Sequence, residues 1–310
     1  MEKVKIVFMG TPVFGKEILR CLVENGYDVV AAVTQPDKAV GRKQVITFSD
    51  VKQYALENNI EVIQPIKIRN DYQRILDINT DLIVTCAYGQ IIPTTILDQP
   101  RLGCVNVHAS LLPYGRGGAP IQHSIIDGLD QTGVTIMEMA AGMDSGDIIS
   151  QSAVTIEDED TYGSLHDKLI ECGKQLLLET LPSIIEHSYT PIKQDEEKVT
   201  FSYNISKEDE HIDLTKPYKD VYNHIRGLIP QPAGYITVDG KKIKIHQVKM
   251  SEEVFEAENG TIVYQNKQMG LVIDNRLLLL EKVQMEGKNI NTAREFINGA
   301  GRELSGKVAE

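Results

Sequence analysis

Short apolar runs alternate with amphipathic segments through the first half of the chain. The apolar runs are nearly continuous, which is typical of strands buried on both faces of a sheet, and the segments between them have helical periodicity. Strands are predicted over residues 3–9, 28–34, 61–63 and 81–88, and helices over 10–25, 49–58, 69–77 and 160–187. Because strands joined through helices form right-handed crossovers, the pattern predicts an α/β fold with a Rossmann-like, mainly parallel sheet and helices on both faces.

The pattern changes after residue 190. Residues 190–206 contain proline and clustered charges without apolar periodicity, which indicates a linker. A helix near 216–228 follows, and then short apolar runs separated by glycine turns cover 235–238, 242–248, 261–265, 271–273 and 277–281, before a short helix near 291–297. We therefore predict an α/β domain over 1–189, a linker over 190–206 and a smaller C-terminal β-barrel of OB-like type over 207–310.

Residues 104–147 concentrate polar side chains at the ends of predicted strands. One apolar strand turns polar at Asn106 and His108, and a second strand over 134–139 leads into a loop with Asp144 and Asp147. Ligands of open α/β sheets bind at such strand ends. Because Asn106 and His108 are two positions apart, a strand points both side chains to the same face.

An amide, an imidazole and a carboxylate together suit one type of chemistry. Asn106 and His108 are able to donate hydrogen bonds to a developing oxyanion, and Asp144 is able to orient His108 or to accept a proton. On the pattern alone, other interpretations stay open: an asparagine at a strand end is often a turn residue, and a single histidine is often structural. Asp147 is predicted to be structural.

Composition narrows the class of protein. The chain has 310 residues, a formal net charge of −12 and 42% hydrophobic residues, as ordinary soluble globular proteins do. The acidic balance argues against indiscriminate nucleic-acid binding, but it allows a local basic surface that binds one RNA. Since no apolar run approaches the roughly 20 residues of a membrane span and no secretory signal is recognised, a cytoplasmic protein without membrane contact is expected.

Two further sequence patterns, a near P-loop at 10–17 and the spacing of the cysteines, do not meet the requirements of the sites that they resemble. Gly10, Gly15 and Lys16 nearly spell a phosphate-binding P-loop, but Glu17 stands where magnesium binding needs a hydroxyl, and Pro12 removes a backbone donor. The cysteines are scattered, without Cys-x-x-Cys spacing, and are predicted to be structural thiols rather than disulfides or zinc ligands. They are Cys21, Cys86, Cys104 and Cys172.

Four ordered motifs carry a family resemblance. They are Asn-Val-His at 106–108, Ser-Leu-Leu-Pro at 110–113, Arg-Gly-Gly-Ala-Pro-Ile at 116–121 and Met-Asp-Ser-Gly-Asp at 143–147. With these motifs the chain resembles the folate-dependent formyltransferases, and as a whole it is similar to the members that formylate methionyl initiator tRNA. The resemblance implies a cytoplasmic, monomeric enzyme of translation initiation that takes its formyl group from 10-formyltetrahydrofolate and needs no metal.

The resemblance also assigns roles to residues. It makes Asn106, His108 and Asp144 catalytic. It places the folate against Tyr88, Gln90, Ile91, Ser110, Leu111, Leu112 and Pro113, where leucines would flank a flat pterin ring. It assigns the loop 37–48, with Arg42 and Lys43, to the tRNA, and it allows Arg116 to face the acceptor end. Lys241, Lys242 and Lys244 belong to the basic cluster of the second domain and are predicted tRNA contacts because such a face suits phosphates. On composition alone, Arg116 is equally well an ion-pair residue. For Lys241, Lys242 and Lys244, composition alone favours a solvent-exposed strand face over a contact with RNA.

Two other functions are kept as alternatives. A formyltransferase acting on an amino sugar-nucleotide, or on another small amine such as glycinamide ribonucleotide, would use the same donor, but it would need neither the 37–48 loop nor the second domain. A non-catalytic folate or nucleotide sensor would be expected to have lost part of the catalytic set, which is complete here. The chain departs from the family pattern outside that set, at Asp50, Tyr114, Gly115 and Gln231.

Overall fold

Two compact units make up the protein. The computed structural model describes residues 4–40 and 44–310. The first unit comprises residues up to 120, 132–154 and 166–203, and the second comprises 121–131, 155–165 and 204–310. The division expected from the sequence, with a linker at 190–206, stays a prediction about independently folding domains. In the structure, residues 190–203 belong to the first unit, and two earlier segments belong to the second.

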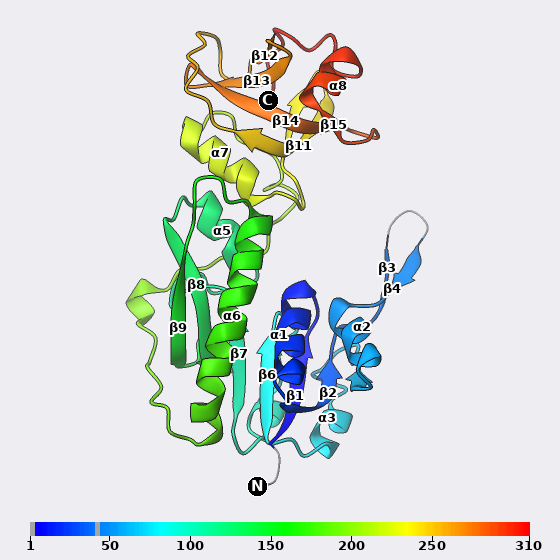
Figure 1. Cartoon of the computed structure of the whole chain (residues 1–310), viewed down its shortest axis with the longest axis vertical. Coiled ribbons are helices and arrows are strands. Elements are labelled where there is room, and N and C mark those ends of the chain that lie inside the picture. Colours follow the sequence, from blue (N-terminus) through cyan, green and yellow to red (C-terminus); the bar gives the residue numbers. More distant parts are fainter. Residues whose placement is uncertain (1–3, 41–43) are drawn as a thin grey trace. The chain divides into compact units, whose positions relative to one another are not determined.

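A seven-stranded sheet forms the centre of the first unit (Figure 1). Its strands, in spatial order, are β5 (Glu61–Ile63), β2 (Asp28–Val33), β1 (Lys5–Gly10), β6 (Leu82–Cys86), β7 (Cys104–His108), β8 (Gln131–Glu138) and β9 (Ile148–Thr155). Neighbouring strands from β5 to β7 are parallel, and β8 is antiparallel to β7. The predicted α/β fold with a mainly parallel sheet is therefore confirmed.

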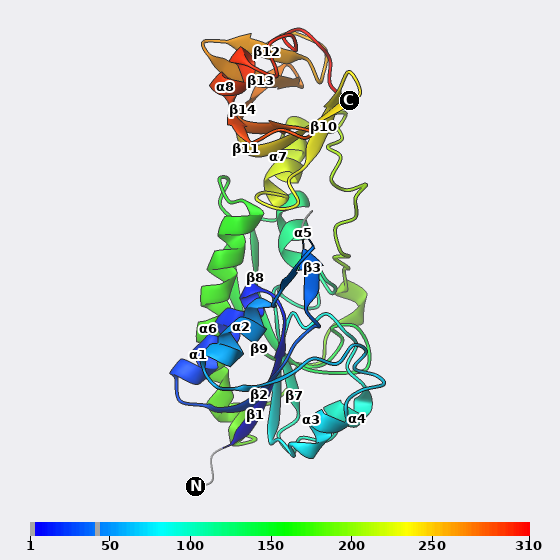
Figure 2. The ribbon, with the colours of Figure 1, turned by 90° about the vertical axis from the view of Figure 1, so that its right-hand side faces the viewer.

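Helices cover both faces of this sheet (Figure 2). One face carries α1 (Val13–Glu24), α2 (Asp50–Glu57) and α6 (Tyr162–Ile185), and the other carries α3 (Gln73–Asp77) and α4 (Thr94–Leu97). Gly173 of α6 lies beside Val107 of β7 and Ile18 of α1. On the opposite face, Ile75 of α3 and Ile96 of α4 belong to one buried apolar cluster with residues of the sheet. Burial on both faces explains the continuous apolar runs of the strands.

The glycines of the near P-loop are explained by close packing. A Cβ on Gly10 would lie 2.7 Å from the Phe8 ring and 2.8 Å from the Cys86 carbonyl oxygen, and a Cβ on Gly15 would lie 2.9 Å from that same oxygen. The Lys16 ammonium lies 3.1 Å from the carboxylate of its neighbour Glu17. These residues therefore bring the start of α1 close to β6, and the lysine is paired within the protein.

The segment predicted as an irregular loop after β2 contains a two-stranded hairpin. Strands β3 (Lys38–Val40) and β4 (Val45–Thr47) pair antiparallel, with Lys38 opposite Thr47 (Figure 1). Ile46 is 68% exposed and Phe48 is 49% exposed. Short strands that bury little apolar surface have no clear periodicity, which is why the sequence pattern did not predict them.

An antiparallel sheet forms the body of the second unit. Its strands are β10 (Tyr235–Val238), β11 (Lys241–Lys249), β12 (Ile262–Gln265), β13 (Gln268–Ile273), β14 (Arg276–Met285) and β15 (Asn291–Thr292). Its helices are α7 (Tyr218–Gly227), α8 (Ala293–Asn298) and most of α5 (Pro120–Ile126). The spatial order is β10-β11-β14-β13-β12, with β15 beside β14. Ile225, Ile243, Leu278 and Phe296 belong to its buried apolar core.

The last residues of the chain join the two edges of this sheet. Glu310 exchanges two backbone hydrogen bonds with Thr237 of edge strand β10, at 2.7 and 2.8 Å. At the other edge, the N–H of Ile262 in β12 donates to the Lys307 carbonyl oxygen at 2.9 Å. The segment 306–310 thus lies between the two edge strands, pairs with both, and gives the antiparallel sheet the closure expected of a small barrel.

Deleting residues 306–310 is expected to destabilise the second unit by roughly 3–5 kcal/mol, because several backbone hydrogen bonds of about 1 kcal/mol each are lost. The buried Ala309 is removed from the core at the same time. Thermal unfolding measures this loss. Lys307→Ala, which keeps the backbone, is the control and should cost less than about 1 kcal/mol. Equal unfolding temperatures for the intact and shortened chains would show that the tail does not close the sheet.

Candidate active site

Strand β7 places Asn106 and His108 on one face of the sheet, where they are 9% and 6% exposed. The parallel strand β6 ends at the same edge, and its Thr85 hydroxyl lies 2.8 Å from Asn106 Oδ1. This contact holds the amide oxygen of Asn106. It leaves the amide NH2 group as a hydrogen-bond donor that faces away from Thr85.

Two groups approach the His108 ring, one at each nitrogen. Nε2 lies 3.0 Å from the carbonyl oxygen of Gly115. Because a carbonyl oxygen only accepts hydrogen bonds, Nε2 is the donor in this contact and carries a proton. Nδ1 lies 3.8 Å from Asp144 Oδ2, which is longer than a direct hydrogen bond. A protonated His108 therefore presents Nδ1–H on the side of the Asp144 carboxylate.

Asp144 reaches His108 from the loop between β8 and β9. Its backbone is left-handed, with φ of 47°, a conformation that costs a non-glycine residue about 1–3 kcal/mol. The Gly117 N–H donates to Asp144 Oδ2 at 2.8 Å. This hydrogen bond holds the carboxylate in place. The Asp144 side chain is 19% exposed, so a substrate amine is able to reach it. The structure thus brings Asp144 to His108, as the proposed chemistry requires.

Arg116 lies in the interior of the first unit, with 5% exposed. Its Nε and Nη2 donate to the side-chain oxygen of Gln194 at 3.0 and 2.9 Å. Its Nη2 and Nη1 donate to the Glu196 carboxylate at 2.7 and 3.2 Å, and this contact lowers the pKa of the Glu196 carboxyl. Arg116 is therefore an ion-pair residue. The burial of the guanidinium and its bonds within the protein favour this interpretation of Arg116 over a contact with tRNA.

The loop predicted to contact folate is folded on itself. Ser110 Oγ donates to the Tyr114 carbonyl oxygen at 2.6 Å, and the Ser110 carbonyl accepts from the Thr135 hydroxyl at 2.6 Å. Leu112 is buried, and its N–H donates to the same Thr135 hydroxyl. These bonds shape the turn that brings the Gly115 carbonyl to His108. The other predicted contacts here, Leu111 and Pro113, are partly buried.

The predicted folate residues after β6 have three different environments. Tyr88 is 4% exposed in an apolar cluster, and burial raises the pKa of its hydroxyl, for which the described residues offer no hydrogen-bond partner. Gln90 accepts from the Ile68 N–H at 2.9 Å and donates to Gln35 at 3.2 Å. Ile91 is 85% exposed, so it is the most accessible of the three to a ligand.

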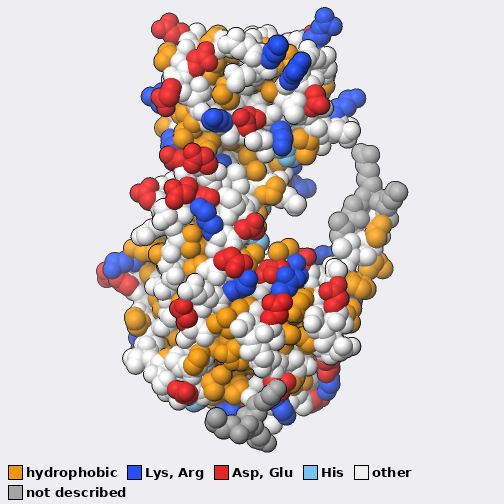
Figure 3. Space-filling view, in the orientation of Figure 1, with side chains coloured by type: hydrophobic (Ala, Val, Ile, Leu, Met, Phe, Trp, Pro, Cys, Tyr) orange, Lys and Arg blue, Asp and Glu red, His pale blue; other side chains and the backbone are white. Residues whose placement is uncertain are grey.

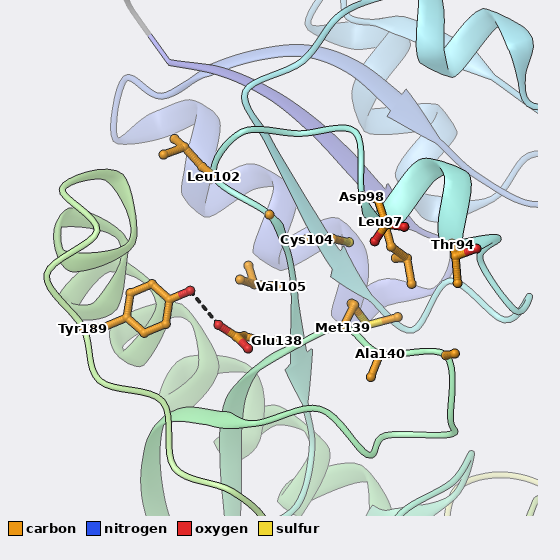
Figure 4. A pocket seen from close by; sticks show the side chains of 12 residues that line it. Thr94, Leu97, Asp98, Leu102, Cys104, Val105, Glu138, Met139, Ala140 and Tyr189 are labelled. Atoms are coloured by element: carbon orange, nitrogen blue, oxygen red, sulfur yellow. Dashed lines mark hydrogen bonds between the residues drawn. The ribbon is translucent and has the colours of Figure 1, made fainter.

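A cavity of about 230 Å³ lies beside the start of β7 (Figure 4). Its apolar lining includes Leu97 of α4, Cys104 of β7 and Met139, which follows β8. Cys104 points to the same face of β7 as Asn106, and the Met139 sulfur lies 3.7 Å from the Thr85 hydroxyl. The lining contains none of the seven residues predicted to bind folate. Cys104 and Met139 have the pattern of core residues, and for this reason the sequence pattern did not indicate the cavity.

A hydrogen bond marks the polar side of this cavity. The Tyr189 hydroxyl donates to Glu138 Oε1 at 2.7 Å (Figure 4). Burial, followed by the contact with Glu138, raises the pKa of Tyr189 to about 12, so this hydroxyl stays protonated at neutral pH. Neither residue was predicted to belong to the site. An isolated glutamate after a strand and a tyrosine next to a presumed linker form no motif.

The lysines predicted to bind tRNA lie on β11 of the second unit. Lys241 and Lys242 are exposed, whereas Lys244 is partly buried and donates to a backbone carbonyl oxygen at 2.8 Å. Lys241 also lines a cavity of about 240 Å³ together with Arg302 and Lys307. On the visible face of this unit, cationic and acidic side chains are interspersed (Figure 3). Lys241 and Lys242 are therefore the accessible members of the predicted set.

Within residues 4–40 and 44–310, no group of His, Cys, Asp and Glu side chains is arranged to hold a metal ion. No helix there is long and apolar enough to cross a membrane. The four cysteines are free thiols, three of them buried.

The fold and the site geometry define the class of protein. The family described as formyl transferase matches residues 3–181, and the formyl transferase C-terminal domain matches residues 204–301. The chain therefore belongs to the formyl transferase family. It is 47% identical to a methionyl-tRNA formyltransferase from Bacillus cytotoxicus over 99% of each chain. A methionyl-tRNA formyltransferase from Bacillus thuringiensis is 46% identical over 99% of each chain.

Solved structures with this fold include other formyl-transferring enzymes. WlaRD, a sugar 3N-formyl transferase, has a TM-score of 0.68 at 20% identity and covers 93% of this chain and 100% of its own. An N-formyltransferase from Helicobacter canadensis, in complex with folinic acid and dTDP-3-aminofucose, has a TM-score of 0.69 at 19% identity, covering 89% and 98%. HypX from Aquifex aeolicus, in complex with tetrahydrofolic acid, has a TM-score of 0.66 at 14% identity, covering 97% and 48%. At these sequence identities, the three similarities show that the fold is shared.

Proposed function

We propose that the protein transfers a formyl group from 10-formyltetrahydrofolate to the free amino group of methionyl initiator tRNA, in translation initiation. The observation that carries this proposal is the approach of Asp144 to His108 beside Asn106, within a chain that matches methionyl-tRNA formyltransferases over its whole length. The protein is proposed to act as a monomer in the cytoplasm, where charged initiator tRNA is used.

Asn106, His108 and Asp144 have different roles in formyl transfer. The amine nitrogen attacks the formyl carbon, a C–N bond forms, and the carbonyl oxygen becomes an oxyanion. The Asn106 NH2 group and the His108 Nδ1–H donate hydrogen bonds to that oxygen. Asp144 accepts the proton of the attacking amine, directly or through a water. When the bond between the formyl carbon and N10 of the folate breaks, that proton passes to N10 and tetrahydrofolate leaves.

The cavity beside the start of β7 is the proposed site of the folate ring. Leu97, Cys104 and Met139 give it apolar walls, and Glu138 adds an acceptor for ring N–H groups. A ring bound there would contact Cys104 and Met139, and the Met139 sulfur lies 3.7 Å from the Thr85 hydroxyl that contacts Asn106 Oδ1. The seven residues predicted from the family motifs stay proposed folate contacts, and Ile91 is the most exposed of them.

Ala140→Phe should raise the KM for 10-formyltetrahydrofolate by about tenfold or more, because Ala140 lines the cavity and a phenyl ring would occupy the space for the pterin. The KM for charged tRNA should stay unchanged. Steady-state kinetics with each substrate varied in turn measure both. Ala300→Phe, at an exposed alanine of the second unit, is the control. An unaltered folate KM in Ala140→Phe would place the folate elsewhere.

The hairpin β3–β4 and the exposed lysines of β11 are the proposed contacts with tRNA. Arg42 and Lys43 lie outside the described residues, and their roles stay predictions. The adjoining Ile46 and Phe48 are exposed apolar side chains, which suit contact with bases rather than with water. Lys241 and Lys242 are positioned to contact phosphates, which orient an RNA without reading its sequence.

Product formation tests the proposed function. The protein is incubated with radiolabelled 10-formyltetrahydrofolate and charged initiator tRNA, and separately with dTDP-3-aminofucose as a small amine acceptor. We expect label in formylmethionyl-tRNA and none in the sugar nucleotide. Label in the sugar nucleotide alone would assign the protein to the small-amine alternative. Absence of transfer to either acceptor, with folate binding intact, would support the sensor alternative.

A further inference from the structure

Gln194 connects the buried Arg116 to the loop that carries Asp144. Its Nε2 donates to the backbone carbonyl oxygens of Asp144 and Gly146, both at 2.7 Å. Its Oε1 accepts from Arg116 Nε and Nη2, at 3.0 and 2.9 Å. Gln194 is 8% exposed and Arg116 is 5% exposed. Both amide hydrogens and the amide oxygen of Gln194 are therefore bound, and only one orientation of the amide satisfies them.

These contacts act on a strained part of the site. A left-handed aspartate persists only where its surroundings hold it, and Asp144 lies in the loop that joins β8 to β9. Gln194 holds the centre of that loop through the Asp144 carbonyl. The carboxylate of the same residue is held by the N–H of Gly117, the residue next to Arg116. Arg116 thus adjoins both groups that hold Asp144.

We propose that Gln194, oriented by Arg116, is a positioning residue for Asp144. This inference rests on the proposed function, in which Asp144 accepts the amine proton. Gln194 acts through the backbone of Asp144 and does not touch the substrate itself. Misplacing a catalytic group by about 1 Å can cost about 10²-fold in rate, so losing this contact should appear in kcat rather than in KM.

Two variants separate positioning from simple packing. Gln194→Met keeps the shape of the side chain and removes both the donor and the acceptor. Gln194→Glu keeps an oxygen for Arg116, as a stronger charged pair, but it removes donation to the two carbonyls. We expect both variants to lower kcat by about tenfold to hundredfold without a change in either KM, when each is assayed well below its own melting temperature. Full activity in Gln194→Glu would overturn the proposal.

Amide hydrogen exchange at Gly117 gives a second readout that does not depend on turnover. The Gly117 N–H should exchange faster in both variants, because the carboxylate that accepts from it is no longer held. Asp195→Asn, at an exposed neighbour, is the matched control and should leave exchange and kcat unaltered. Exchange as slow as in the wild type would overturn the proposal. If the wild-type protein failed to formylate tRNA, the proposed function would be refuted instead. The exchange rate at Gly117 would still test the role of Gln194, because it does not depend on the acceptor.

Discussion

Replacing Asp144 with asparagine is expected to lower kcat by about 10³-fold. The amide cannot accept the amine proton, and the negative charge beside the His108 Nδ1–H is lost. The size of the side chain is unchanged, and the asparagine oxygen can still accept from the Gly117 N–H. Binding of 10-formyltetrahydrofolate should therefore stay close to that of the wild type. Single-turnover formylation of charged initiator tRNA, together with folate binding by fluorescence titration, measures both effects.

Asp147→Asn is the matched control for this prediction. It makes the same chemical change three residues later in the same loop, at a residue that is not placed next to His108. Its kcat should change by less than about threefold, which is within the range of ordinary surface effects. Near-normal turnover in Asp144→Asn would remove that carboxylate from the mechanism. Equal losses in both variants would point to a general effect of charge in the loop.

Replacing Asn106 with alanine is expected to lower kcat by about 10²–10³-fold, the usual cost of removing one donor from an oxyanion site. The Asn106 NH2 group faces away from Thr85, so the variant removes this donor and leaves the strand intact. The KM values for folate and tRNA should change little, because the hydrogen bond is made to charge that develops after binding. Pre-steady-state formylation rates provide the measurement.

Thr85→Val is the control that separates donation from orientation. It removes the hydroxyl that contacts Asn106 Oδ1 at 2.8 Å but keeps the Asn106 NH2 group. The loss in kcat should be below about tenfold, as expected for one neutral hydrogen bond of 0.5–1.5 kcal/mol. If Asn106→Ala were no slower than Thr85→Val, the amide would be a structural partner of Thr85 rather than a donor to the oxyanion.

Local periodicity was sufficient to predict the sheet and part of the site. Continuous apolar runs gave β1, β2, β6 and β7, because strands covered on both faces need apolar residues throughout. The two-residue spacing of Asn106 and His108 placed both side chains on one face of β7. The link to Asp144 came from the family motifs, since no local rule connects a strand to a loop that follows another strand.

Contacts between distant segments could not be predicted in this way. For Arg116 the sequence did not decide between an ion pair and a contact with RNA, because its partners, Gln194 and Glu196, lie in a segment that has the composition of a linker. The same segment holds the Asp144 loop, so part of the site is supplied by residues that carry no motif. The closure of the antiparallel sheet by 306–310 likewise depends on pairing between ends of the second unit that lie far apart in sequence.

The central claim is that Asn106, His108 and Asp144 stabilise one transition state together. Single-turnover formylation by Asn106→Ala, Asp144→Asn and the double variant tests it most directly. Residues that act as a unit show losses that do not multiply. We predict that the double variant is at most about tenfold slower than the slower single variant. Losses that multiply in full would mean that the two side chains act independently, and this would contradict the account.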